Sequence, residues 1–155
     1  MLMPQSPSTS RQKKKTPQIA IKREAGFYKQ VKDATQRTRK KWTLTRIENW
    51  VGAGIPDLLI CDDKGLFHLI ELKFTKSNRV ELRPTQVSWL TKHQHSSSWI
   101  LIKKQNKPTD KAECLLYPAS SAVDLKMEGI SKVKPLFRCQ QPFCWEEIFS
   151  LISLT

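Results

Sequence analysis

Two short apolar segments separated by a turn signal constrain the fold of this chain more than any other feature. Residues 57–61 (DLLIC) and 66–74 are each the length of a typical strand, and residues 62–65 (DDKG) lie between them. Apolar runs of this length joined by a few turn-forming residues predict a β-hairpin. The hairpin brings Asp57, at the start of the first strand, close to the middle of the second.

The second strand of this hairpin carries charged residues within an apolar run. Alternate residues of a strand share a face, so Glu71 and Lys73 project to one side while Ile70 and Leu72 project to the other. Charged groups among apolar neighbours are costly to half-bury without a purpose. Because the hairpin returns Asp57 to this strand, two carboxylates and one ammonium group are expected in one patch.

The oxygen atoms of this patch predict a divalent-metal site. Mg²⁺ and Mn²⁺ prefer hard oxygen ligands, which Asp57 and Glu71 provide, and the main-chain carbonyl of Leu72 is a further candidate ligand. A metal held there would lower the pKa of a bound water and neutralise charge on a scissile phosphate. Lys73 is the candidate for holding the attacking water and stabilising the charged transition state.

The same residues also have ordinary structural interpretations. Asp57 follows a proline and would serve equally well in a turn, and Glu71 with Lys73 would form a solvent-facing pair on an edge hairpin. Phe67 and Leu69 lie on the same face as this pair, which favours a partly buried surface over a solvated one. The three charged residues in this order therefore favour the metal site.

The rest of the sequence predicts helices and strands in an order typical of an α/β domain. Helices are expected over residues 19–38, from Pro84 onward, over 118–127 and over 145–151, and further strands over 42–50, 99–102 and 113–117. We expect one α/β domain over residues 18–155, with a mixed central β-sheet flanked by helices.

Positive charge is concentrated near the N-terminus. Of a formal net charge of +13, residues 11–46 hold 13 Lys or Arg against Glu24 and Asp33, a local balance of 13 − 2 = +11. Such a density attracts nucleic acid, although a solvated tail gives the same pattern. Residues 1–17 are expected to form a disordered basic arm. The candidate contacts are, for phosphates, Lys13, Lys14, Lys15, Lys40, Lys41 and Arg46 and, for bases, Tyr28 and Trp42.

Cysteine spacing and hydropathy argue against several classes of protein. The four cysteines form no C-x-x-C pair and have no matching histidine cluster, so reduced thiols are expected, with a disulfide or half of a metal site at Cys139 and Cys144 as the alternative. No stretch reaches the roughly 18 apolar residues of a membrane span. The N-terminus lacks the apolar run of a signal peptide, so secretion is not expected.

Pro56-Asp57, followed after thirteen residues by Glu71-Leu72-Lys73, resembles the motif of the PD-(D/E)XK nuclease superfamily. The longer string GIPDLLICDDKGLFHLIELKF, followed by LRPTQVSWL, is similar to the VRR-NUC branch and to Holliday-junction-resolvase-like phage nucleases. This similarity covers roughly residues 20–105, and residues 106–155 have no obvious counterpart. The resemblance implies a restriction-endonuclease-like fold.

The resemblance also implies roles for individual residues. Glu24, on the first predicted helix, matches an acidic residue that members of the superfamily often add to the metal site, and Glu48, just upstream of the hairpin, is its rival. The residues implied to form the catalytic centre are the metal ligands Asp57 and Glu71, the catalytic lysine Lys73, and Gln86, which helps to place water or phosphate beside that lysine.

The activity implied by this resemblance is hydrolysis of DNA phosphodiester bonds with Mg²⁺ or Mn²⁺, leaving 3′-hydroxyl and 5′-phosphate ends. Stand-alone members of the branch tend to serve replication, repair or recombination, so branched, flapped or junction DNA is the expected substrate. Many members come from bacteriophages, which implies that the protein acts in a bacterial cytoplasm. Symmetric cutting of two strands would need two active sites, which implies a homodimer. Two alternatives stay open: a non-catalytic nucleic-acid-binding module of the same fold, and a sequence-specific restriction-type endonuclease.

Overall fold

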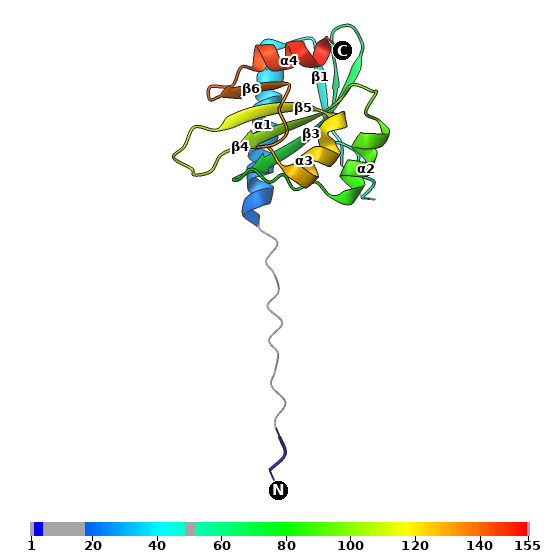
Figure 1. Cartoon of the computed structure of the whole chain (residues 1–155). Helices are drawn as coiled ribbons and strands as arrows, with labels where there is room; N and C mark the ends of the chain where they lie inside the picture. The colour runs from blue at the N-terminus through cyan, green and yellow to red at the C-terminus, as the bar shows by residue number, and fades with distance from the viewer. Residues whose placement is uncertain (1, 5–17, 49–51, 155) are drawn as a thin grey trace.

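The computed structural model of the chain describes residues 2–4, 18–48 and 52–154 (Figure 1). The predicted basic arm falls outside these ranges apart from residues 2–4, and so do its candidate phosphate contacts Lys13, Lys14 and Lys15. Within the described ranges, no helix is long and apolar enough to cross a membrane.

A six-stranded mixed sheet forms the centre of the described chain. Its strands are β1 (Thr43–Arg46), β2 (Leu58–Cys61), β3 (Phe67–Thr75), β4 (Ser98–Lys104), β5 (Glu113–Pro118) and β6 (Phe137–Gln140). They follow one another across the sheet in chain order, and every neighbouring pair is antiparallel except β3 and β4. That pair is parallel because a helix connects the two strands as a crossover.

Helices cover both faces of this sheet (Figure 1). They are α1 (Gln18–Thr38), α2 (Pro84–Lys92), the 3₁₀ turn η1 (Ala119–Ser121), α3 (Ala122–Glu128) and α4 (Trp145–Ser153). Helices α1 and α4 pack on one face, whereas α2 and α3 pack on the other. The predicted α/β class, with a mixed sheet between helices, is therefore confirmed.

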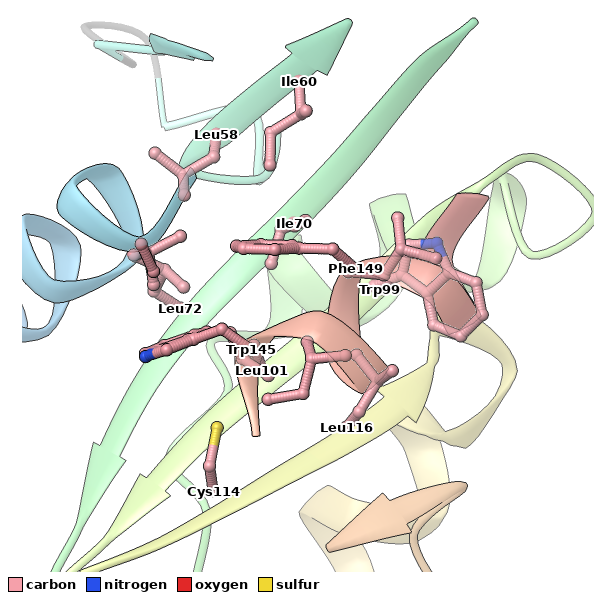
Figure 2. Close-up of a cluster of buried hydrophobic side chains, with 14 of the residues drawn as sticks. Leu58, Ile60, Ile70, Leu72, Trp99, Leu101, Cys114, Leu116, Trp145 and Phe149 are labelled. Atoms are coloured by element: carbon pink, nitrogen blue, oxygen red, sulfur yellow. The ribbon is translucent and has the colours of Figure 1, made fainter. Parts of the chain in front are cut away.

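Strand alternation divides the apolar side chains between two cores. On β4, Leu101 joins the cluster under α1 and α4, whereas Ile100 and Ile102 join the cluster under α2 and α3. Figure 2 shows the first cluster, in which Trp145 and Phe149 of α4 lie against side chains from the central strands. A strand buried on both faces needs a continuous apolar run, which explains the composition of β4.

Three elements differ from the sequence expectation. Strand β1 is shorter than the predicted 42–50, and residues 49–51 of that range lie outside the described residues. The helix predicted over 118–127 begins instead with the turn η1. Strand β6 was not predicted, because its side chains alternate between half-buried and exposed at the sheet edge and form no apolar run.

The hairpin turn is fixed by a buried polar network. Asp62 Oδ1 accepts hydrogen bonds from the backbone N–H groups of Lys64 and Leu66, at 2.9 and 3.0 Å. Asp62 Oδ2 lies 2.8 Å from His68 Nε2, and the other ring nitrogen of His68 lies 2.5 Å from Ser97 Oγ. The hydrogen bond with His68 is the main reason that the pKa of Asp62 is lowered. This network secures the register that places Asp57 opposite β3.

Candidate active site

Asp57 lies immediately before β2, at the point where β2 and β3 separate. The last paired residues are Leu58 and Ile70, so β3 continues alone on this side from Glu71 onward. The backbone N–H of Leu72 donates a hydrogen bond to Asp57 Oδ2 at 2.9 Å. The aspartate therefore takes the place that a further strand residue would occupy, which holds its carboxylate beside the middle of β3.

Glu71 is almost fully buried, with 1% of its surface exposed. Its Oε1 accepts a hydrogen bond from Gln86 Nε2 at 2.6 Å and lies 3.3 Å from Lys73 Nζ. Its Oε2 is buried and has no hydrogen-bond partner among the described residues. A buried carboxylate oxygen without a donor is costly, and a cation at that position would remove the cost.

Gln86 links the lysine to this carboxylate. Besides donating to Glu71, its side chain accepts hydrogen bonds through Oε1 from Lys73 Nζ at 3.1 Å and from the Arg83 backbone N–H at 2.9 Å. Gln86 is in the first turn of α2, where Pro84 starts the helix. The N-terminal turn of α2 therefore positions Glu71 and Lys73 together. We call Asp57, Glu71, Lys73 and Gln86 the carboxylate centre.

Burial determines the charge state of Glu71. Its pKa is raised to about 8, first by desolvation and then by the charge of Asp57, whereas Lys73 lowers it by charge and hydrogen bonding and Glu24 raises it slightly. In the absence of a cation, Glu71 is therefore largely protonated at neutral pH. A cation in contact with the carboxylate would favour its ionised form.

Glu24 of α1 belongs to the same electrostatic neighbourhood. The pKa of its carboxyl is raised, chiefly by desolvation, and it responds to the charges of Lys73 and Asp57. The residue as a whole keeps substantial solvent exposure, so its burial is only partial. Glu48 is exposed as well. The electrostatic interaction of Glu24 with Lys73 and Asp57 favours Glu24 as the additional acidic residue.

The donor set of this centre fits a hard divalent cation. Leu72 directs its N–H toward Asp57, and the carbonyl of a strand residue points to the same side as its own N–H. As the side chains stand, no three His, Cys, Asp or Glu residues in the described part of the chain are close enough together to form a metal site. Mg²⁺ needs only one or two carboxylates, with waters and substrate phosphate completing its shell. Asp57 and Glu71 meet that requirement, and Glu71 Oε2 is free to accept a cation.

No family model and no curated protein matches this chain. Function is therefore inferred from the residues of the carboxylate centre and from their geometry.

The partly buried face of the hairpin is narrower than the sequence indicated. Phe67 is 63% exposed, contrary to expectation, whereas Glu71 and Lys73 on the same face are largely shielded. Gln86 of α2 contacts Glu71 and Lys73 directly, whereas Leu69 is half-buried and Phe67 lies at the exposed start of β3. The polar patch is therefore sheltered without being enclosed by a wide apolar surface.

The described basic and aromatic candidates lie outside the carboxylate centre. Lys40, Lys41 and Arg46 are exposed, and the Arg46 guanidinium lies 4.9 Å from the centre of the Tyr28 ring. Trp42 is half-buried and stacks on His68 while its edge meets Phe149. Much of the Trp42 ring is therefore engaged within the protein.

All four cysteines are free. Cys139 and Cys144 are neighbours, as the sequence indicated, and the Cys144 backbone N–H lies 3.3 Å from Cys139 Sγ. Burial raises the pKa of the Cys139 thiol to about 11, although the hydrogen bond from the Cys144 backbone N–H lowers it. A thiol with so high a pKa is a poor thiolate donor at neutral pH.

Gly54, the first residue of the string GIPDLLI, has a positioning role that the motif did not indicate. Its φ is +77°, and a Cβ at this position would lie 2.1 Å from the Thr85 carbonyl oxygen and 2.7 Å from the Gln86 backbone nitrogen. Both are backbone atoms in the first turn of α2. The glycines of this loop signal a turn in the sequence, but the partner of the loop is visible only in the fold.

Replacing Gly54 with Ala is expected to lower the free energy of unfolding by about 2 kcal/mol or more, since alanine adds left-handed strain and a backbone clash. Urea denaturation measures the loss. Gly52→Ala is the matched control, because Gly52 has φ +65° but open space around its Cβ position. Equal losses in the two variants would show that the close approach to α2 contributes nothing.

Proposed function

We propose that this protein is a divalent-metal-dependent DNA endonuclease of the PD-(D/E)XK type. The observation that carries the proposal is the buried Glu71 carboxylate, which has one unpartnered oxygen and lies beside Lys73 and Gln86. Asp57 is held next to it through the backbone of Leu72. A restriction-endonuclease-like fold is part of the proposal, and the mixed sheet with helices on both faces supports it.

Each residue of the carboxylate centre has its own proposed role in phosphodiester hydrolysis. Asp57 and Glu71 would hold the Mg²⁺ or Mn²⁺ ion, with the Leu72 carbonyl and Glu24 as additional donors. When bound, the ion would supply charge neutralisation at the scissile phosphate and a lowered pKa for a water. Lys73 orients the attacking water and stabilises the negative charge that develops on the phosphate.

Gln86 acts through its neighbours. Its carbonyl oxygen receives the Lys73 ammonium and its amide group donates to Glu71, so it fixes the distance between the lysine and the metal-binding carboxylate. The products are 3′-hydroxyl and 5′-phosphate ends.

Branched, flapped or junction DNA is the proposed substrate, in replication, repair or recombination within a bacterial cytoplasm. The charge balance of +11 in residues 11–46 supports a polyanionic ligand, because clustered Lys and Arg attract phosphates independently of sequence. Lys40, Lys41 and Arg46 present part of this charge on the described surface. A homodimer would supply the two centres that symmetric cutting requires.

A panel of labelled DNA shapes tests the proposal directly. With Mg²⁺, the protein is expected to cut flapped, forked or four-way DNA to products with 5′-phosphate ends, and EDTA is expected to abolish cutting. Discrete bands from linear plasmid DNA would instead indicate a sequence-specific enzyme. Binding to these shapes without cleavage of any of them, with Mg²⁺ or Mn²⁺, would show a non-catalytic module.

A further inference from the structure

A basic hollow lies at the C-terminal end of α1, away from the carboxylate centre. It has a volume of about 570 Å³ and is bounded by the end of α1, the residues before β1, the β2–β3 turn and α4. Its lining holds five cationic side chains and a single acid, Asp63. The cationic residues that define the basic hollow are Arg37, Arg39, Lys40, Lys41 and Lys64.

The acidic groups near the basic hollow do not neutralise it. Asp63 offsets one of the five positive charges, and its Oδ1 accepts a hydrogen bond from Trp42 Nε1 at 3.2 Å. Glu146 is mostly exposed and only approaches Arg39, at 3.8 Å. Arg39 also donates to Ser150 Oγ at 2.8 Å, while its buried Nε has no hydrogen-bond partner among the described residues. The basic hollow therefore combines surplus positive charge with hydroxyl groups, a combination that suits a phosphate.

The distance between the basic hollow and the carboxylate centre follows from two separate elements. Along α1, Arg37 lies thirteen residues beyond Glu24, which corresponds to about 20 Å of helix. Along β2 and its turn, Asp63 lies six residues beyond Asp57, again at most about 20 Å of extended chain. The helix route gives roughly 20 Å between the hollow and Glu24, and the strand route sets about 20 Å as the upper limit of its distance from Asp57.

The edge strand β1 runs from the basic hollow toward the carboxylate centre. Trp42, in the lining of the hollow, directly precedes β1. At the other end, Arg46 pairs with Leu58, and the Ile47 backbone N–H donates to the Asp57 carbonyl oxygen at 2.7 Å. No acidic residue occurs between Trp42 and Ile47. A polyanion can therefore follow β1 from the basic hollow, on the α1–α4 side of the sheet, as far as Asp57. Glu71 and Lys73 project to the α2–α3 side and lie beyond the point where β2 and β3 separate.

We propose that the basic hollow holds neighbouring backbone phosphates of a DNA arm about six base pairs from the scissile phosphate. The spacing follows because duplex DNA rises 3.4 Å per base pair, so about 20 Å corresponds to about six pairs. The location of the cut rests on the proposed nuclease function, whereas binding of DNA in the hollow does not require cleavage. The DNA runs along β1, and Arg46 contacts the backbone between the two ends.

Removing charge from the hollow tests whether it binds DNA. In EDTA, the double variant Lys40→Ala/Lys41→Ala is expected to reduce the slope of log affinity against log salt by about two, one for each lost phosphate contact. The control is Lys107→Ala/Lys111→Ala, which removes two exposed lysines from the β4–β5 connection and is expected to keep the wild-type slope. Equal slopes for both double variants would overturn the proposal.

Arm length tests the spacing. Branched DNAs whose arms are shortened stepwise from twelve to three base pairs are compared by fluorescence anisotropy in EDTA. Wild type is expected to lose affinity sharply as arms shrink below about six pairs, and the Lys40→Ala/Lys41→Ala variant is expected to lack this step. A smooth decline in wild type would overturn the proposal. If affinity falls sharply below about six base pairs but the protein cuts no DNA, the nuclease function is refuted and the hollow remains a DNA-binding site.

Discussion

Replacing Lys73 with Ala is expected to reduce DNA cleavage by about 100- to 1,000-fold while leaving DNA affinity nearly unchanged. The Lys73 ammonium lies 3.1 Å from Gln86 Oε1 and 3.3 Å from Glu71 Oε1, so it is held at the centre where negative charge develops during hydrolysis. Its contribution belongs to the transition state, whereas DNA is held by many phosphate contacts elsewhere. Single-turnover cleavage and anisotropy on the same branched DNA separate the two effects.

Lys76→Ala is the matched control, because Lys76 is an exposed lysine just beyond the end of the same strand. It is expected to cut DNA at the wild-type rate. Asp57→Ala is expected to lose cleavage as Lys73→Ala does, because it removes a proposed metal ligand. Cleavage by Lys73→Ala at more than a tenth of the wild-type rate would remove the lysine from the mechanism.

Replacing Glu71 with Gln is expected to stabilise the metal-free protein and abolish cleavage at the same time. The pKa of Glu71 in the folded chain is about 8, above its ordinary value of 4.5. Below pH 4.5 both folded and unfolded states hold the proton, so the fold incurs no penalty. As pH rises from 4.5 to 8 the unfolded state ionises first, and stability falls by up to about 4 kcal/mol. Glutamine stays neutral and avoids this loss.

Urea denaturation in EDTA at pH 5 and pH 8 measures the effect. Wild type is expected to be less stable at pH 8, and the difference between Glu71→Gln and wild type is expected to grow with pH. Glu81→Gln, at an exposed carboxyl, is the control for the loss of one negative charge. A constant difference between Glu71→Gln and wild type across this range would refute the buried, protonated state of Glu71.

Addition of Mg²⁺ is expected to reverse the penalty in wild type. A ligand that binds only the folded state stabilises it in proportion to the logarithm of its concentration. Because the carboxylate must lose its proton to bind the ion, apparent Mg²⁺ affinity is expected to fall about tenfold per pH unit below pH 8. Glu71→Gln is expected to show neither the stabilisation nor its pH dependence.

Several elements that form the centre were predictable from local sequence. Glu71 and Lys73 share a face because strand residues alternate sides, and the turn at 62–65 brings Asp57 back to them. These relations depend on neighbours within about fifteen residues. Strand β6, in contrast, is held by backbone pairing at a sheet edge and has no apolar pattern that could predict it.

The partners of these residues depended on the tertiary structure. Gln86 was matched by resemblance, but only the packing of α2 showed that one amide contacts both Lys73 and Glu71. The resemblance already favours Glu24 over Glu48, and the interaction of Glu24 with Lys73 and Asp57 supports that order. The basic hollow joins Arg39 to Ser150, 111 residues apart in the chain.

By itself, the sequence determined the hairpin, the common face of Glu71 and Lys73, and the return of Asp57 to them, because strand periodicity and turn chemistry act over short stretches of chain. Only the tertiary structure decided that Glu71 is buried with one oxygen unpartnered and that its pKa is raised to about 8. Desolvation depends on every group packed around a carboxyl. The groups next to Glu71 lie on α1, just before β2, on β3 itself and on α2, and these elements meet only in the fold.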